Sequence, residues 1–323
     1  LQHLFHSLPA KCSGIYVDIY ATTCLKDFTN LLATAILQTF PEKKSIGKKL
    51  MVALKSLRPI FSFDSLSGVP EVSFDFAQPK QFEHSVTQLL KFLDAQNQII
   101  IIAIDEFQQI LNYPEKNTEA YLRTIIQQLK NVRFIFSGSS QHLLADMFTN
   151  VKRPFFSSGQ SMYLHEIDTL LYSTFIKEQF TKSKKTISDE AIDFILEFTH
   201  RHTYYTQALC NKLFSTGTKK ITLADAQKTA SIILHENEAI YFQYRSLLTV
   251  NQWQLLKAIA QADKVYQPSS KKFIQQYHLG TPANVQRSLE ALLNKEMIFS
   301  KKDSIGNYYR VYDCFLLRWL TTK

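Results

Sequence analysis

The stretch that decides the fold reads Ile-Ile-Ile-Ile-Ala-Ile-Asp-Glu-Phe-Gln over residues 99–108. Its first six residues are almost purely β-branched and are the right number for one strand. This composition is typical of a strand that is buried on both faces, as in the middle of a parallel sheet covered by helices. We therefore expect residues 99–104 to form the central strand of an α/β domain.

The sequence on both sides of this strand alternates strand and helix patterns. Short apolar runs predict further strands, and apolar side chains at helical spacing predict helices between them; the strands are residues 14–20 and 132–137, and the helices 27–40, 82–93 and 119–129. Such alternation implies right-handed crossovers and a parallel sheet with helices on its faces. Residues 58–79 contain three prolines and a Ser-Gly turn, which indicates an inserted hairpin or loop.

Two other patterns follow. Residues 168–244 show helices only, with Ser188 and Thr222 placed as N-caps. The last part contains three helix patterns, the third of which Thr281 would cap, and then two short strands, which is the order of a winged helix-turn-helix. We predict an α/β domain over residues 1–165, a helical domain over 166–246 and a winged helix over 247–323.

The composition excludes several classes of protein. The 323 residues are 45% hydrophobic and 13% aromatic, which is typical of folded globular protein. Four scattered cysteines suggest neither disulfides nor a zinc site, and no apolar run has the length of a membrane span. We expect a cytoplasmic protein without membrane contact. The net charge of +9 permits nucleic-acid binding, but dispersed lysines also make an ordinary solvated surface.

Asp105 and Glu106 are the strongest candidates for chemistry. They follow the central strand, and ligands of open α/β sheets bind outside the carboxyl ends of the strands. One carboxylate, Asp105, can hold Mg²⁺ through water, while Glu106 orients and deprotonates the water that attacks a phosphoryl group. The alternative is that Asp105 only ends a strand and Glu106 begins a solvated turn.

Three further residues are candidates near this pair. Ser137 and Ser139 follow the next strand, where a hydroxyl can sense a γ-phosphate or position water. The same Ser-Gly-Ser-Ser run is also common in plain turns. Arg153 can stabilise phosphate charge, or it can be an ordinary surface arginine.

The third helix of the winged helix has an outer face that can reach base edges. Asn284, Gln286, Arg287 and Ser288 are expected on this face, and Val285 and its apolar neighbours on the inner one. The region is basic, but winged helices dock proteins nearly as often as DNA, so a DNA or a protein partner stays open.

With the motifs in this order, the chain resembles the prokaryotic AAA+/STAND-like P-loop ATPases described as the ATPase domain predominantly from archaea. The resemblance extends over nearly the whole chain and rests on segments 16–18, 68–74, 102–108, 136–139, 153–155, 204–207 and 312–320.

The resemblance implies a P-loop NTPase-type parallel sheet, a helical lid domain and a C-terminal winged helix, with ATP and Mg²⁺ as cofactors. It implies that Asp105 and Glu106 form the Walker B pair and that Ser137 or Ser139 takes the sensor-1 place. Tyr204 and Gln207 would belong to a lid motif beside the nucleotide. A nucleotide-dependent oligomer is a further expectation.

The chain departs from the family pattern in two places. The Walker A loop, which supplies most of the phosphate affinity, is expected just before Leu1, so the given chain is expected to be truncated and to bind ATP poorly by itself. Arg201 and Thr203 replace the usual Gly and Pro of the lid motif.

Three functions are compatible with these features. The first is an ATP-hydrolysing switch that couples nucleotide state to the winged helix. The second is an inactive ATPase-fold scaffold that binds DNA or protein through the winged helix. The third is a winged-helix regulator with an unrelated sensor domain.

Overall fold

The computed structural model describes residues 2–41, 45–55, 59–63, 65, 68–76 and 78–322. The chain divides into two compact units after Ser161, and each unit has its own hydrophobic core. The predicted helical domain and winged helix share the core of the second unit. The domain boundaries at 165 and 246 stay predictions.

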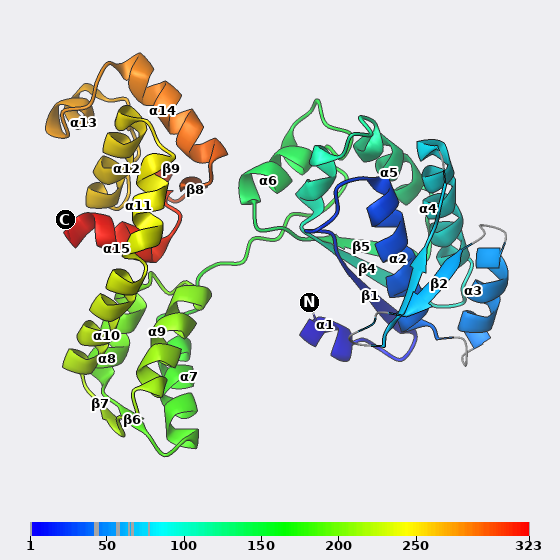
Figure 1. Cartoon of the computed structure of the whole chain (residues 1–323), viewed down its shortest axis with the longest axis horizontal. Helices are drawn as coiled ribbons and strands as arrows, with labels where there is room; N and C mark the ends of the chain where they lie inside the picture. The colour runs from blue at the N-terminus through cyan, green and yellow to red at the C-terminus, as the bar shows by residue number, and fades with distance from the viewer. Residues whose placement is uncertain are drawn as a thin grey trace. The chain divides into compact units, whose positions relative to one another are not determined.

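The first unit is built around a three-stranded parallel sheet (Figure 1). Its elements are α1 (Gln2–His6), β1 (Cys12–Asp18), α2 (Leu25–Thr39), α3 (Ser45–Lys55), β2 (Ile60–Phe63), β3 (Pro70–Ser73), α4 (Pro79–Asp94), β4 (Ile99–Asp105), the 3₁₀ helix η1 (Phe107–Asn112), α5 (Thr118–Ile126), β5 (Val132–Phe136) and α6 (Gln141–Thr149).

The isoleucine run forms the central strand, as predicted. β4 pairs in parallel with β1 on one side and with β5 on the other. The register sets Asp18 opposite Asp105 and Phe136 opposite Ile104, so the carboxyl ends of all three strands meet at one edge. This edge is where the fold places a ligand site.

The segment rich in proline forms the predicted hairpin. β2 and β3 pair antiparallel, with Ile60 opposite Ser73. Val72 of β3 is buried, and its backbone amide donates a 2.9 Å hydrogen bond to Oγ1 of Thr34 on α2. The hairpin is thereby fastened to α2, which itself packs on β1 and α4.

The second unit consists mainly of helices. Its elements are α7 (Thr169–Lys182), β6 (Thr186–Ile187), α8 (Asp189–Phe198), α9 (Thr203–Ser215), β7 (Lys220–Ile221), α10 (Leu223–Glu236), α11 (Glu238–Ser246), α12 (Val250–Ala262), α13 (Lys271–Gln276), α14 (Pro282–Asn294), β8 (Ile298–Lys302), β9 (Asn307–Val311) and α15 (Cys314–Thr322).

The prediction of helices only over residues 168–244 is wrong in one respect. β6 and β7 pair in parallel, with Ile187 opposite Ile221. Each strand has two residues, too few to produce a periodic signal, and the pairing depends on the burial of the two isoleucines in the helical core.

The predicted caps are confirmed. The side chain of Ser188 accepts from the amide of Ala191 at the start of α8, and that of Thr281 accepts from Asn284 at the start of α14. Thr222 and Asp225 form a reciprocal capping box on α10. These bonds satisfy helix N-terminal amides that otherwise have no partner.

The last part is a winged helix. α12 packs against α14 and α15, and β8 and β9 form the antiparallel wing, with Lys302 opposite Asn307. Val265 adds an antiparallel bridge to Tyr309. None of the helices in the described part of the chain is long and apolar enough to span a bilayer.

Candidate nucleotide site

Asp105 is the centre of the candidate site, because neighbouring strands direct hydroxyls at its carboxylate. Tyr16 on β1 donates a 2.7 Å hydrogen bond to Oδ2, and Ser137, which follows β5, donates a 2.7 Å bond to Oδ1. The amide of Glu106 adds a 3.2 Å bond to Oδ1. Three strands therefore hold one half-buried carboxylate at the ligand edge of the sheet.

These bonds set the charge of the site. Burial tends to raise the pKa of Asp105, but the hydrogen bonds from Ser137, Tyr16 and the Glu106 amide outweigh it and lower the pKa below the ordinary value of 3.8. Burial and the nearby Asp105 carboxylate raise the pKa of Tyr16 to about 12. At neutral pH, Asp105 is an anion and Tyr16 a donor.

Glu106 lies beside Asp105 in an uncommon backbone conformation. Its φ of 55° and ψ of 39° are left-handed, which is costly for a residue with a side chain and is often found at functional sites. The turn directs the carboxylate toward the loop after β5, where Oε2 accepts a 2.9 Å bond from the Ser139 hydroxyl. Gln108 donates a second bond to the same oxygen.

Gly138 lies in close contact with the Gln108 side chain. A Cβ at this position would lie 2.0 Å from Oε1 of Gln108. That oxygen is buried and accepts no hydrogen bond from any described residue. The loop after β5 and the turn after β4 therefore fit together through a glycine.

The carboxylates at this edge of the sheet fit a Mg²⁺ ion that keeps most of its water ligands. Within the described ranges, no three His, Cys, Asp or Glu side chains converge as a metal cage. Mg²⁺ commonly keeps several waters and uses one or two carboxylates together with substrate phosphates. Asp105, with the exposed Asp18 beside it in register, supplies that kind of incomplete site.

Arg153 lies in a salt-bridge network. Its Nε is 2.9 Å from Asp146 on α6, and one terminal nitrogen is 3.2 Å from Glu119 on α5. Burial raises the pKa of Glu119, and Arg153 opposes this effect. In this geometry the guanidinium joins α5, α6 and the following loop.

Sequence reasoning missed Tyr16 and Gln108 as parts of the site. For Tyr16 a signal was present, because Ile15, Val17 and Ile19 alternate as buried residues and so place Tyr16 and Asp18 together on the other face of the strand. No periodic signal identifies Gln108, since its role depends on the turn at Glu106.

The two lid-motif candidates belong to the second unit. Tyr204 and Gln207 are in the first turns of α9, and both side chains are exposed. The ring of Tyr204 packs edge-on against that of Tyr205, with centroids 5.1 Å apart.

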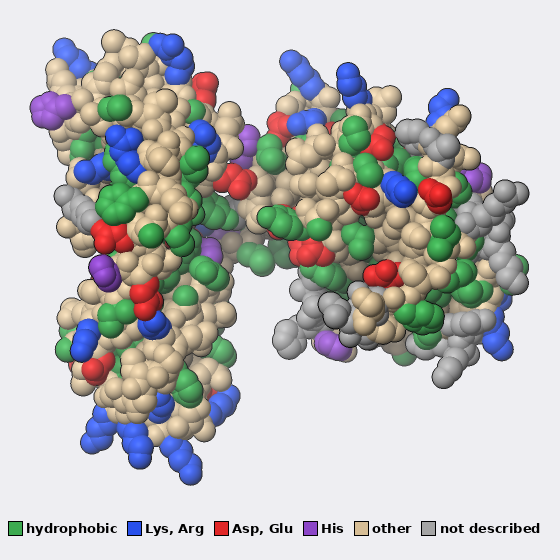
Figure 2. Space-filling view, in the orientation of Figure 1, with side chains coloured by type: hydrophobic (Ala, Val, Ile, Leu, Met, Phe, Trp, Pro, Cys, Tyr) green, Lys and Arg blue, Asp and Glu red, His purple; other side chains and the backbone are tan. Residues whose placement is uncertain are grey.

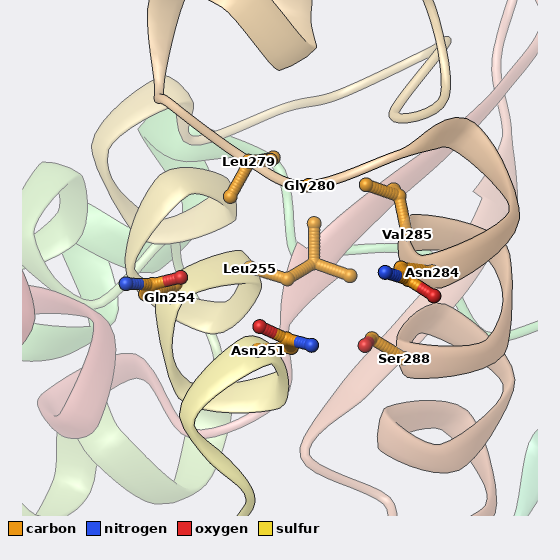
Figure 3. Close-up of a pocket in the computed structure, with 8 residues that line it drawn as sticks. All are labelled: Asn251, Gln254, Leu255, Leu279, Gly280, Asn284, Val285 and Ser288. Carbon is orange, nitrogen blue, oxygen red and sulfur yellow. The ribbon is translucent and has the colours of Figure 1, made fainter.

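The winged-helix candidates divide between two surfaces. Gln286 and Arg287 are exposed on α14, while Asn284 is half-buried beside the hollow between α12 and α14 that Figure 3 shows. Arg287 donates a 2.7 Å bond to Asn284. The expectation that Ser288 faces outward is wrong: it is 7% exposed and lines the same hollow.

This hollow is too small for an organic ligand. Its volume is about 10 Å³, and polar groups of Asn251, Asn284 and Ser288 line it (Figure 3). Such a space holds one water molecule at most.

The comparisons with known proteins agree with this architecture. Residues 239–322 match a protein family described as "Probable winged helix domain". The chain is similar to the solved structure of a Walker-type ATPase of Pyrococcus abyssi, with a TM-score of 0.62, 16% identity, and coverage of 95% of this chain and 83% of that one. The chain is also similar to the Orc2 protein of Aeropyrum pernix, solved as ADPNP and ADP complexes. Here the TM-score is 0.53 at 13% identity, and the alignment covers 99% of this chain and 80% of the Orc2 chain. No curated protein sequence matches.

The chain therefore has an α/β unit with a parallel sheet, followed by a helical region and a C-terminal winged helix, and this fold is similar to that of the Walker-type ATPase. At these identities the likeness concerns the fold.

Proposed function

We propose that the chain forms part of an ATP-hydrolysing, STAND-like switch protein whose nucleotide state controls the winged helix. The observation that carries the proposal is the Asp105 carboxylate, held ionised by Tyr16 and Ser137 at the ligand edge of the sheet, with Glu106 next to it. The ATPases of similar fold make nucleotide the first ligand to test.

In this proposal Asp105 and Glu106 have separate roles. Asp105 would hold Mg²⁺ through water, and that ion would supply positive charge to the phosphates. Glu106 orients the attacking water and accepts its proton. Ser137 and Ser139 already bond to the two carboxylates, so either hydroxyl can transmit the presence of a γ-phosphate to the acidic pair.

The remaining candidates have weaker support. Arg153 would have to leave Asp146 and Glu119 to reach a phosphate. The exposed side chains of Tyr204 and Gln207 are free of the core and can bind a ligand. Asn284, Gln286 and Arg287 are proposed as the winged helix's contacts to DNA or protein.

One observation favours a second candidate function, a scaffold that binds nucleotide without hydrolysing it. Bonds from Ser139 and Gln108 to Oε2 hold the Glu106 carboxylate against the loop after β5 and leave mainly Oε1 to accept a proton from water. A protein in which these bonds keep the carboxylate away from the attacking water would bind ATP and not turn it over.

The test is Glu106→Gln in the complete protein, with phosphate release and the binding of a fluorescent ATP analogue measured separately. The matched control is Glu71→Gln, which removes an exposed carboxylate on β3. We expect E106Q to bind the analogue like the wild type and to lose at least a hundredfold in turnover, in line with the usual contribution of a general base.

The other outcomes are equally clear. Turnover that survives in E106Q removes Glu106 from its role. A wild type that binds nucleotide without measurable turnover supports the scaffold. Absence of any nucleotide binding by the complete wild-type protein contradicts both functions.

A further inference from the structure

One end of the second unit carries lysine and hydroxyl side chains without any carboxylate. It consists of residues 181–186, where α7 ends, and 214–220, where α9 ends, and we name these two segments the lysine end. They lie side by side because β6 pairs with β7, which sets Thr186 opposite Lys220. Figure 2 shows Lys and Arg side chains gathered at the end of the unit that carries β6 and β7 in Figure 1.

The composition of the lysine end is one-sided. It contains no Asp or Glu, and its basic and hydroxyl residues are Lys182, Lys184, Lys185, Lys219, Lys220, Thr181, Ser183, Thr186, Ser215, Thr216 and Thr218. On α7 the nearest carboxylate in sequence is Glu178, one turn before Lys182. On α8 it is Asp189, which already pairs with Lys177.

Four of the five lysines point into solvent. Lys185 is the exception, because its ammonium donates a hydrogen bond to the backbone oxygen of Phe214. The same ammonium lies 4.3 Å from the centre of the Phe214 ring. The remaining four, Lys182, Lys184, Lys219 and Lys220, are exposed. None of them forms an ion pair with a carboxylate in the described ranges of the chain.

The frame that carries these lysines is rigidly packed. Phe180, Ile187, Leu213 and Ile221 flank the two segments and are at most 7% exposed. The turn at Gly217 has a φ of 79°, a conformation that glycine adopts without strain. A fixed backbone lowers the entropy that is lost when a partner binds.

Helix electrostatics explain only part of the cluster. Lysines near a helix C-terminus are favoured by the helix dipole, which accounts for Lys182 in the last turn of α7 and for Lys185 on the carbonyl at the end of α9. Lys219 and Lys220 come after the turn that ends α9, and Lys184 lies beyond α7. Their shared location is not explained by the stability of either helix.

We infer that the lysine end binds the phosphodiester backbone of nucleic acid without reading base sequence. Ammonium and hydroxyl groups are the usual donors to phosphate oxygens, and such contacts position a nucleic acid without specifying its bases. Protein interfaces, by contrast, are depleted in lysine and serine and enriched in aromatic residues, methionine and arginine. Phe214 is the only large apolar side chain of the lysine end that is exposed, so nucleic acid is favoured over an acidic protein.

The test compares two quadruple variants of the full chain. K182S/K184S/K219S/K220S removes the four exposed lysines of the lysine end and leaves Lys185 bonded to the backbone oxygen of Phe214. The control K48S/K49S/K80S/K91S removes the same charge from exposed positions on α3 and α4. Binding of a labelled 20-base-pair duplex of random sequence is measured by anisotropy at several salt concentrations, without ATP, and a polyglutamate peptide of equal charge serves as the second probe.

We expect the first variant to lose about tenfold or more in duplex affinity at low salt and the control to lose much less. The slope of log K against log salt should fall by about 1 for each lysine that contacts a phosphate. Equal affinities and slopes for the two variants would overturn the inference. If polyglutamate binds the wild type as tightly as the duplex does, and the same variant loses that binding, the nucleic-acid inference is overturned and an acidic protein is the favoured partner.

Discussion

The hydroxyl of Tyr16 donates a 2.7 Å hydrogen bond to Oδ2 of Asp105, and the two residues are 89 positions apart in the chain. The bond joins β1 to the carboxyl end of β4 and helps to keep Asp105 ionised, since it opposes the effect of burial on the pKa of the carboxyl. The bond therefore makes β1 and β4, which are neighbours in the sheet, parts of one site.

Tyr16→Phe should raise the pKa of Asp105 toward 3.8, because the variant removes one of the bonds that lower it. In the wild type, the stabilisation that this lowered pKa represents is present above about pH 3.8 and is lost as the pH falls through the native value. The variant should lose about 1 kcal/mol at pH 7 and less near pH 3. NMR titration of the carboxyl and urea unfolding at the two pH values measure both effects.

Tyr20→Phe is the control, because Tyr20 is 74% exposed at the end of the same strand region. This variant should change neither the pKa of Asp105 nor the free energy of unfolding. An unaltered Asp105 titration in Y16F would show that Ser137 and the Glu106 amide are sufficient.

Arg153→Ala should destabilise the first unit by about 2 kcal/mol, because it leaves Glu119, which is 9% exposed, without its cation. Since burial already raises the pKa of Glu119 above 4.5, the loss should be largest at neutral pH and shrink as Glu119 is protonated. Urea unfolding at pH 7 and pH 4.5 measures this.

The second variant in this experiment is R153A/E119Q. It should recover much of the lost stability, because no buried charge remains unpaired. Lys152→Ala, at an exposed neighbour, should have little effect. If the double variant recovers stability but ATP turnover stays low, Arg153 has a catalytic role in addition to its structural one.

Local signals in the sequence were sufficient to predict the three strands of the parallel sheet and several of the helices. The β-branched run over residues 99–104 predicted the central strand, because no other regular structure buries such a run on both faces as well. Ser188, Thr222 and Thr281 predicted helix starts, because each makes its cap within three residues. Such contacts can be read from a short window of sequence.

Contacts between distant segments were not predicted. The partners of Arg153 and the bond from Tyr16 depend on how strands and helices pack, and the β6–β7 pair has too few residues to show a period. Ser288 was expected outside because serine is polar, but a small side chain also fits where α12 approaches α14 closely. The acidic pair could be predicted because it follows directly from the end of one strand.

Gly138→Ala should cost about 1 kcal/mol, because the new methyl group would lie 2.0 Å from Oε1 of Gln108 and that side chain must move. In a Gln108→Ala background the same change should cost little. A double-mutant cycle by chemical unfolding measures the difference. The control is Gly159→Ala, where the nearest atom is 3.8 Å away. A cost that is the same in both backgrounds would show that the backbone, and not Gln108, requires glycine.

His200 should make the second unit sensitive to mild acid. Burial and then the charge of Arg310 lower its pKa to about 4, while Asp263, whose Oδ1 lies 3.4 Å from Nε2, acts in the opposite direction. Arg318 and Lys264 add further positive charge nearby. The ring is therefore neutral in the folded chain at a pH where the unfolded chain binds a proton.

The sign of the effect follows from this difference. The contribution of the neutral ring to the free energy of unfolding is fully present above the ordinary pKa of 6.5. It decreases as the pH falls from there toward about 4. Between pH 7 and pH 5 the second unit should lose about 2 kcal/mol through this group alone. His200→Asn, which tolerates the left-handed backbone at φ 50°, should remove most of that dependence in urea unfolding.

The matched control is His278→Asn. His278 has nearly the same backbone, with φ 52°, and its side chain is exposed. The control variant should keep the pH dependence of the wild type, because it leaves the cluster of His200, Asp263 and Arg310 intact. If H200N and H278N lose stability equally between pH 7 and pH 5, another group is responsible and the neutral state of His200 is contradicted. If H200N alone becomes insensitive, the turn after α8 is the acid-sensitive point, where His200 contacts Asp263, which is itself paired with Arg310.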